Sequence, residues 1–204
     1  MFSITIIIIV VTCLITLAGF KNPKVVDELI FWPPAITEKH QYYRFITCGL
    51  IHADYIHLLF NMLTLYFFGT IMEAYYQGQL GLQKWYYLAL YIGALIVSNI
   101  PTYLKHRKDY NYRSLGASGA VSAVLFAFIL LRPWQRIIVL VFPVPAIVYG
   151  GLFLVYSMYM SKKGGDHVNH DAHFYGAIFG VVFTIACRPE VIEIFLNELK
   201  NPHF

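Results

Sequence analysis

Residues 116–133 read GASGAVSAVLFAFILLRP, an apolar run of 14 residues that opens at Ser118 and stops at an Arg-Pro pair. A helix of that length rises about 21 Å, whereas the hydrocarbon core of a bilayer is about 30 Å thick. A second short run, His173–Cys187, also stops at an Arg-Pro pair. If both pairs mark one membrane face, both helices begin below the opposite face, where non-helical chain is tolerated only against protein or a water-filled cavity. The two runs therefore predict a pocket with a serine and a histidine at similar depth.

The composition is that of a membrane protein. Of the 204 residues, 58% are hydrophobic and only 13% are charged, whereas a soluble domain has about 25% charged residues. This excludes a disordered chain, a secreted disulfide scaffold and an ordinary cytosolic domain. We expect an all-α polytopic membrane protein with six transmembrane helices, at about residues 4–20, 57–76, 85–104, 118–131, 137–160 and 173–187. Pro143 and Pro145 are expected to bend the first half of the fifth helix.

The long segment between the first two expected spans, residues 21–56, is not simply polar. It contains Trp32, Tyr42 and Tyr43, and such aromatic residues prefer the membrane interface. We therefore expect a structured loop that is partly submerged after the first helix. The tail, residues 189–204, is expected to form one short amphipathic helix, and the whole chain, residues 1–204, is read as a single membrane domain.

The charge and the cysteine content argue against several kinds of partner and cofactor. The net charge of +4 is weak and scattered, so no nucleic acid is expected. Three cysteines without a CxxC pair favour neither a disulfide framework nor a zinc ribbon. We expect no cofactor and no metal ion.

The residues at the expected pocket have the chemistry of acyl transfer. A serine hydroxyl is a weak nucleophile unless a neighbouring base accepts its proton, and His173 can be that base for Ser118. Since no acidic residue is well placed to orient His173, a dyad is expected rather than a triad. His57 and Asn61 are four residues apart on the second helix, and with the Ser118 backbone N–H they can stabilise the oxyanion.

The motifs and their order resemble the rhomboid family of intramembrane serine proteases. The resemblance covers most of the chain and rests on HxxxN (His57, Asn61), GxxxE (Gly69, Glu73), GASG (residues 116–119) and AHxxG (Ala172, His173, Gly176). It implies the six-helix rhomboid fold and cleavage of peptide bonds in or near transmembrane helices of membrane proteins, through an acyl-enzyme. It also implies Ser118 as nucleophile, His173 as base, His57 and Asn61 at the oxyanion site, and Glu73 as a structural carboxylate.

The chain departs from the family's pattern in three places. Many members have an aromatic residue one turn after the nucleophile that stacks on the catalytic histidine, whereas this chain has Ser122. The family's Trp-Arg pair in the first loop resembles Tyr43-Arg44 here, and the glycine that often follows the buried glutamate by four residues is displaced to Gly78.

Membrane orientation receives two opposed predictions. Resemblance to bacterial members implies a plasma-membrane protein whose active site opens to the extracytoplasmic side. With that orientation, ten of the 15 Lys and Arg residues lie on the active-site side, whereas the positive-inside rule favours the reverse. We retain the family orientation as the expectation.

Three other readings stay open. A non-proteolytic rhomboid-like protein could bind membrane helices with a misaligned dyad. A six-helix transporter could use His52, His57 and His173 as a proton relay. A metal could bind His167, His170 and His173, although HExxH is absent and solvated loop histidines are the plainer explanation of the first two.

Overall fold

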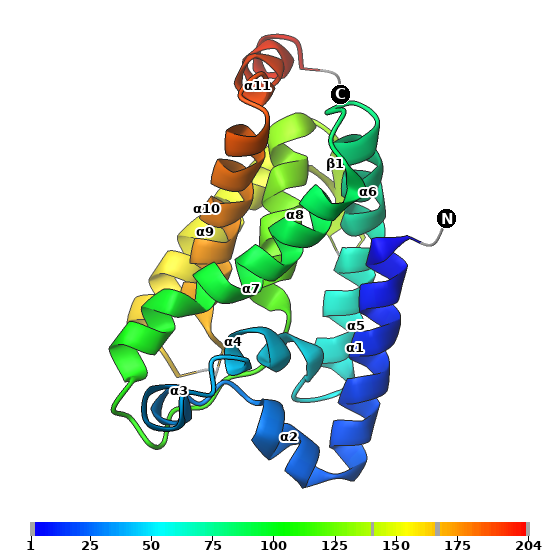
Figure 1. Ribbon diagram of the computed structural model, residues 1–204. Helices are drawn as coiled ribbons and strands as arrows, with labels where there is room; N and C mark the ends of the chain where they lie inside the picture. Colours follow the sequence, from blue (N-terminus) through cyan, green and yellow to red (C-terminus); the bar gives the residue numbers. More distant parts are fainter. Residues whose placement is uncertain (1–2, 140, 166–167, 203–204) are drawn as a thin grey trace.

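The computed structural model describes residues 3–139, 141–165 and 168–202. Three of its helices are long and apolar enough to cross a membrane: α1 (Ile4–Lys21), α7 (Lys84–His106) and the continuous helix Tyr55–Gln77. The last is built from α5 (Tyr55–Thr64), the π-helical turn η2 (Leu65–Gly69) and α6 (Thr70–Gln77). A shorter apolar helix, α8 (Ser118–Leu131), packs at the centre of the bundle between α7 and α10 (His170–Cys187) (Figure 1). All of α8 from Gly119 to Leu131 is buried, so this apolar run forms the core of the protein.

The expected partly submerged loop contains four short helical segments. These are α2 (Pro23–Leu29), α3 (Pro33–Lys39), α4 (Arg44–Thr47) and η1 (Cys48–Leu50), and α2–α4 gather at the lower end of the view in Figure 1. The buried Arg44 guanidinium holds the loop together by donating to the carbonyls of Asp27 and Ile30. An antiparallel bridge between Phe31 and Ser114 then fastens the loop to the segment that leads into α8.

The prediction for the fifth helix is wrong in its first half. Two antiparallel strands, β1 (Arg136–Val139) and β2 (Phe142–Pro145), take its place, and α9 (Ala146–Lys163) begins only after them. The physical reason is the pair Pro143 and Pro145, which lack the N–H that a helix interior needs but fit a short edge strand. The prolines therefore delay the helix instead of bending it.

The sixth expected helix begins earlier than predicted. It starts at His170 and not at His173, because Asn169 caps it by accepting a hydrogen bond from the Ala172 N–H. Its 18 residues rise about 27 Å, so this helix is not short, and the argument from two short helices holds only for α8. The tail forms one helix, α11 (Val191–Lys200), at the upper end of Figure 1, as the sequence predicts; residues 203 and 204 of that tail lie outside the described residues.

Glu73 fixes the start of α1. Its carboxylate accepts hydrogen bonds from the Ser3 and Thr5 hydroxyls, at 2.6 and 2.9 Å, and from the backbone N–H groups of Ile4 and Thr5, at 2.7 and 3.0 Å. The first N–H groups of a helix have no partner within it, and a carboxylate also suits the positive end of the helix dipole. Glu73 thereby has a structural role at the junction of two helices.

Candidate active site

Ser118 is the first residue of α8 and is preceded by a turn that only glycine accommodates well. Gly116 has φ +117° and its N–H donates to the Cys48 carbonyl at 2.9 Å. A Cβ built on Gly116 would lie 2.7 and 2.9 Å from the Cε1 and Nε2 atoms of His57. The glycine therefore lets the His57 imidazole approach the backbone two residues before Ser118.

The helices that carry Ser118 and His173 touch through their backbones. A Cβ built on Gly176 of α10 would lie 2.8 Å from the Gly119 carbonyl carbon of α8, and one on Gly180 would lie 2.7 Å from that of Ala123. Gly119 follows Ser118, and Gly176 is one turn after His173. These small residues let the two helices approach closely, and they bring the turn of α10 that follows His173 against the first turn of α8.

The ring that stacks on His173 comes from α9, a helix to which the sequence assigns no such role. Phe153 of α9 lies with its ring centroid 5.7 Å from that of His173 at an interplanar angle of 26°. The position expected to hold an aromatic residue, Ser122, is buried in α8. The histidine ring is therefore packed against an aromatic side chain, although from α9 and not from α8.

Asn61 and His57 lie on one face of α5, as their spacing predicts. The Asn61 side chain is buried, and its Nδ2 donates to the His57 carbonyl at 3.0 Å. An amide nitrogen carries two protons, so this bond uses one of them. His57 is half-buried, and its ring lies 5.0 Å from the ring of His52, edge to face.

His52 is held in one tautomer between α1 and the turn before Ser118. The Thr16 hydroxyl donates to the Leu50 carbonyl at 3.0 Å, so at its 3.2 Å contact with His52 Nδ1 it accepts the proton. Nε2 is then free of hydrogen and accepts the Ala117 N–H at 3.4 Å. Burial, followed by the neighbouring His57, lowers the pKa of His52 to about 3. A neutral, doubly bound imidazole is a poor proton relay, which weakens the transporter reading.

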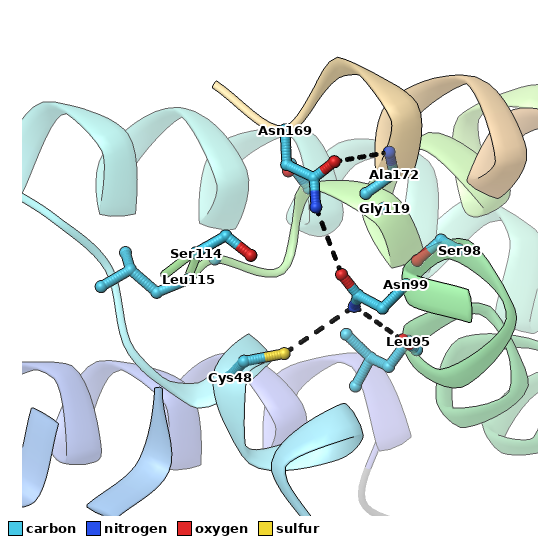
Figure 2. Close-up of a pocket in the computed structure, with 11 residues that line it drawn as sticks. Cys48, Leu95, Ser98, Asn99, Ser114, Leu115, Gly119, Asn169 and Ala172 are labelled. Carbon is cyan, nitrogen blue, oxygen red and sulfur yellow. Dashed lines mark hydrogen bonds between the residues drawn. The ribbon is translucent and has the colours of Figure 1, made fainter. Parts of the chain in front are cut away.

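A small cavity lies beside Ser118, between α7, the turn before α8 and the start of α10. Its polar lining includes Ser98, Asn99, Ser114 and Asn169, and Figure 2 shows the amides of Asn99 and Asn169 facing one another across it. The cavity volume of about 10 Å³ is close to what one water molecule needs.

Four residues at or near this site were not assigned these roles from the sequence: His52, Asn99, Phe153 and Asn169. Asn169 carried a usable signal, since asparagine is a favoured N-cap residue. Phe153 carried none, because nothing in its spacing connects it with His173. Of the suggested metal ligands, His167 lies outside the described residues, and within the described part of the chain no three His, Cys, Asp or Glu residues group as a metal site.

Comparison with known proteins places this chain in a family. A model of the rhomboid domain matches residues 39–190. The Bacillus subtilis protein named "Putative rhomboid protease YdcA" is 26% identical over 166 residues, which cover 78% of this chain and 77% of the relative.

Two relatives from organelles are similar over a smaller share. Rhomboid-like protein 11, chloroplastic, of Arabidopsis thaliana is 32% identical and the match covers 70% of this chain. Presenilin-associated rhomboid-like protein, mitochondrial, of Rattus norvegicus is 31% identical over 64% of this chain. The matches cover 51% and 34% of these two relatives. With its apolar helices and the matched domain, the chain is an integral membrane protein that belongs to the rhomboid family, whose members are generally intramembrane serine proteases.

Proposed function

We propose that this protein is an intramembrane serine endopeptidase with a Ser118–His173 dyad. The observation that carries the proposal is the backbone contact of α8 and α10 at Gly119 and Gly176, because it sets the starts of both helices beside one another. This contact supports the proposal, because nucleophilic activation requires the serine and the histidine within hydrogen-bond reach of one another. The stacking of Phe153 on His173 supports it further, because a base must be held in orientation as well as in place.

In the proposed reaction, the Ser118 Oγ attacks the carbonyl carbon of the scissile peptide bond and its proton passes to His173. The negative charge that develops on the carbonyl oxygen is stabilised by the Ser118 backbone N–H, His57 and Asn61. The first N–H groups of a helix point outward without a partner in the helix, and the helix dipole favours an anion there. The second proton on Asn61 Nδ2 adds a donor.

The acyl-enzyme then forms and is hydrolysed. His173 gives its proton to the leaving amine, which departs with the C-terminal part of the substrate and leaves an ester on Ser118. Water attacks this ester with His173 again as base, so the products are a carboxylate and the regenerated serine. The water-sized cavity that Ser118 lines supports the proposal, because it offers water a place beside the ester.

The proposal also includes the fold and the substrate. The chain forms one membrane domain with six spans in a lipid bilayer, and its substrates are transmembrane proteins. We place the active site at the extracytoplasmic face of a bacterial plasma membrane, with neither cofactor nor metal taking part. Glu73 holds α1 and does not act on the substrate.

The test is covalent labelling by a fluorophosphonate probe in detergent. We expect the wild type to be labelled and both Ser118→Ala and His173→Ala to lose labelling while keeping their thermal unfolding midpoints. Cleavage of a single-span membrane substrate should be lost in the same two variants. Substantial labelling or cleavage in either variant would refute the dyad, and a folded wild type that reacts with neither probe nor substrate would favour the non-proteolytic binder.

A further inference from the structure

The helix that carries His173 is capped by a side chain that is itself held by a second helix. Asn169 Oδ1 accepts the Ala172 N–H at 3.0 Å and the Thr102 hydroxyl at 3.0 Å. Its Nδ2 donates to Asn99 Oδ1 at 3.4 Å. Asn99 and Thr102 both belong to α7 and are buried.

The orientation of the Asn169 and Asn99 side-chain amides is fixed by the backbone group that each of them binds. The Ala172 N–H can only donate, so it needs the oxygen of Asn169. The Leu95 carbonyl can only accept, so it needs the nitrogen of Asn99, which donates to it at 2.9 Å. The two remaining ends, Asn169 nitrogen and Asn99 oxygen, are then complementary, as Figure 2 shows. Neither amide can flip without losing a backbone partner.

The same network reaches the loop that supports the turn before Ser118. Asn99 Nδ2 also lies 3.8 Å from Cys48 Sγ, and the Cys48 carbonyl accepts the Gly116 N–H. Cys48 and Asn99 both line the cavity beside Ser118. One set of bonds therefore connects the turn before Ser118, α7 and the first turn of α10.

We propose that Asn169, held by Asn99 and Thr102, is the positioning residue for His173, a role that rests on the proposed dyad. His173 lies four residues after the cap, and its own N–H donates to the Asn169 carbonyl at 3.3 Å. It therefore belongs to the first turn of the helix. Gly164 and Gly165, at the end of α9, have φ values of +64° and +101°, and a Cβ on either would meet nothing within 4 Å. The cap, together with the contacts of Asp171 to Ser161 and Lys105, thus fixes the turn that carries His173.

The experiment measures fluorophosphonate labelling of Ser118 as a saturable reaction, with kinact for the chemical step and KI for probe binding. We expect Asn169→Ala to lower kinact on the order of 10- to 100-fold, the loss that a misplacement of about 1 Å causes, and to leave KI within about twofold. Asn169→Asp keeps an oxygen for the Ala172 N–H and Thr102 but loses the donor to Asn99 Oδ1, so it should recover kinact only in part.

Two further variants separate positioning from general stability. Asn22 caps α2 in the same manner, accepting the Lys24 N–H at 3.1 Å, and no proposed site residue lies on α2. Asn22→Ala should therefore leave kinact unchanged. Because Asn99 acts through Asn169, Asn99→Ala should lower kinact, and the double variant with Asn169→Ala should lose no more than Asn169→Ala alone.

The proposal would be overturned by wild-type kinact in folded Asn169→Ala, by an equal loss in Asn22→Ala, or by losses that multiply in the double variant. Failure of the dyad itself would be seen separately, as labelling that persists in His173→Ala.

Discussion

The close approach of α8 and α10 at Gly176 makes Gly176→Ala a sensitive probe of the proposed dyad. The added methyl carbon would lie 2.8 Å from the Gly119 carbonyl carbon, whereas ordinary contact begins at 3.4 Å. The Gly119 carbonyl oxygen lies closer still, and as helix backbone it cannot rotate away, so the helices must separate by more than the roughly 0.6 Å that the carbon contact alone requires. Such overpacking costs about 1–3 kcal/mol of stability, of which the better helix propensity of alanine offsets up to about 1 kcal/mol.

The effect on chemistry should exceed the effect on stability. A dyad requires about 2.6–3.2 Å between Oγ and the imidazole nitrogen, and an opening of about 0.6 Å is as wide as that whole range. We expect kinact for the fluorophosphonate probe to fall roughly 10- to 100-fold, measured below the unfolding midpoint of the variant.

Two glycines supply the controls. A Cβ on Gly151 of α9 meets nothing within 4 Å, so Gly151→Ala should leave kinact unchanged. Gly180→Ala would press on Ala123 in the same way as Gly176→Ala presses on Gly119, but one turn farther from His173, and should cause a smaller loss. Wild-type kinact in folded Gly176→Ala would refute the reasoning, since the dyad would then not need this approach.

Three other predictions follow from contacts around the site. Phe153→Leu should lower kinact about 2- to 10-fold, because an aromatic stack contributes about 0.5–1.5 kcal/mol. Phe153→Tyr should restore kinact. Equal rates in wild type and Phe153→Leu would show that stacking on His173 is unimportant. Because the pKa of His52 is about 3 in the folded protein and 6.5 ordinarily, only the unfolded chain takes up this proton as the pH falls from 7 to 5. Wild type should then lose about 2 kcal/mol more stability than His52→Gln, and parallel pH curves of thermal unfolding would contradict this. Glu73→Ala leaves the N–H groups at the start of α1 without their acceptor and should lower stability by about 2–4 kcal/mol, while kinact of the folded fraction stays at the wild-type value; a selective loss of kinact would give Glu73 a role at the site.

Much of the helical organisation could be predicted because particular residue types, such as proline, mark where helices begin and end. The predicted bounds of α8 match the structure, since Gly-Ala precedes Ser118 and Arg132-Pro133 ends the run. The strands β1 and β2 were missed because apolar residues without clear periodicity fit a strand as well as a helix. The start of α10 was missed because polarity at residues 170–172 outweighed the cap signal of Asn169.

The site was predictable in part, for a related reason. Ser118, His173, His57 and Asn61 stand in short motifs whose spacing has meaning on a helix, so the sequence alone can indicate them. The ring on His173 comes from Phe153, 20 residues away on another helix, and only the packing of α9 reveals it. The same applies to His52, whose role depends on Thr16 and the Ala117 backbone meeting around it.

The π-helical turn at residues 65–69 has a consequence for how one helix serves two ends of the molecule. Asn61 and Glu73 are both buried, yet at about 100° per residue the 12 steps between them would point them about 120° apart on a regular α-helix. A π turn absorbs one extra residue, which reduces the difference to about 20°. The turn thus changes the angle between the two side chains about the helix axis, so that Asn61 faces the site while Glu73 faces α1. The turn therefore accommodates one residue more than a regular α-helix needs, so deleting one residue within it would leave 11 α-helical steps and keep Asn61 and Glu73 about 20° apart.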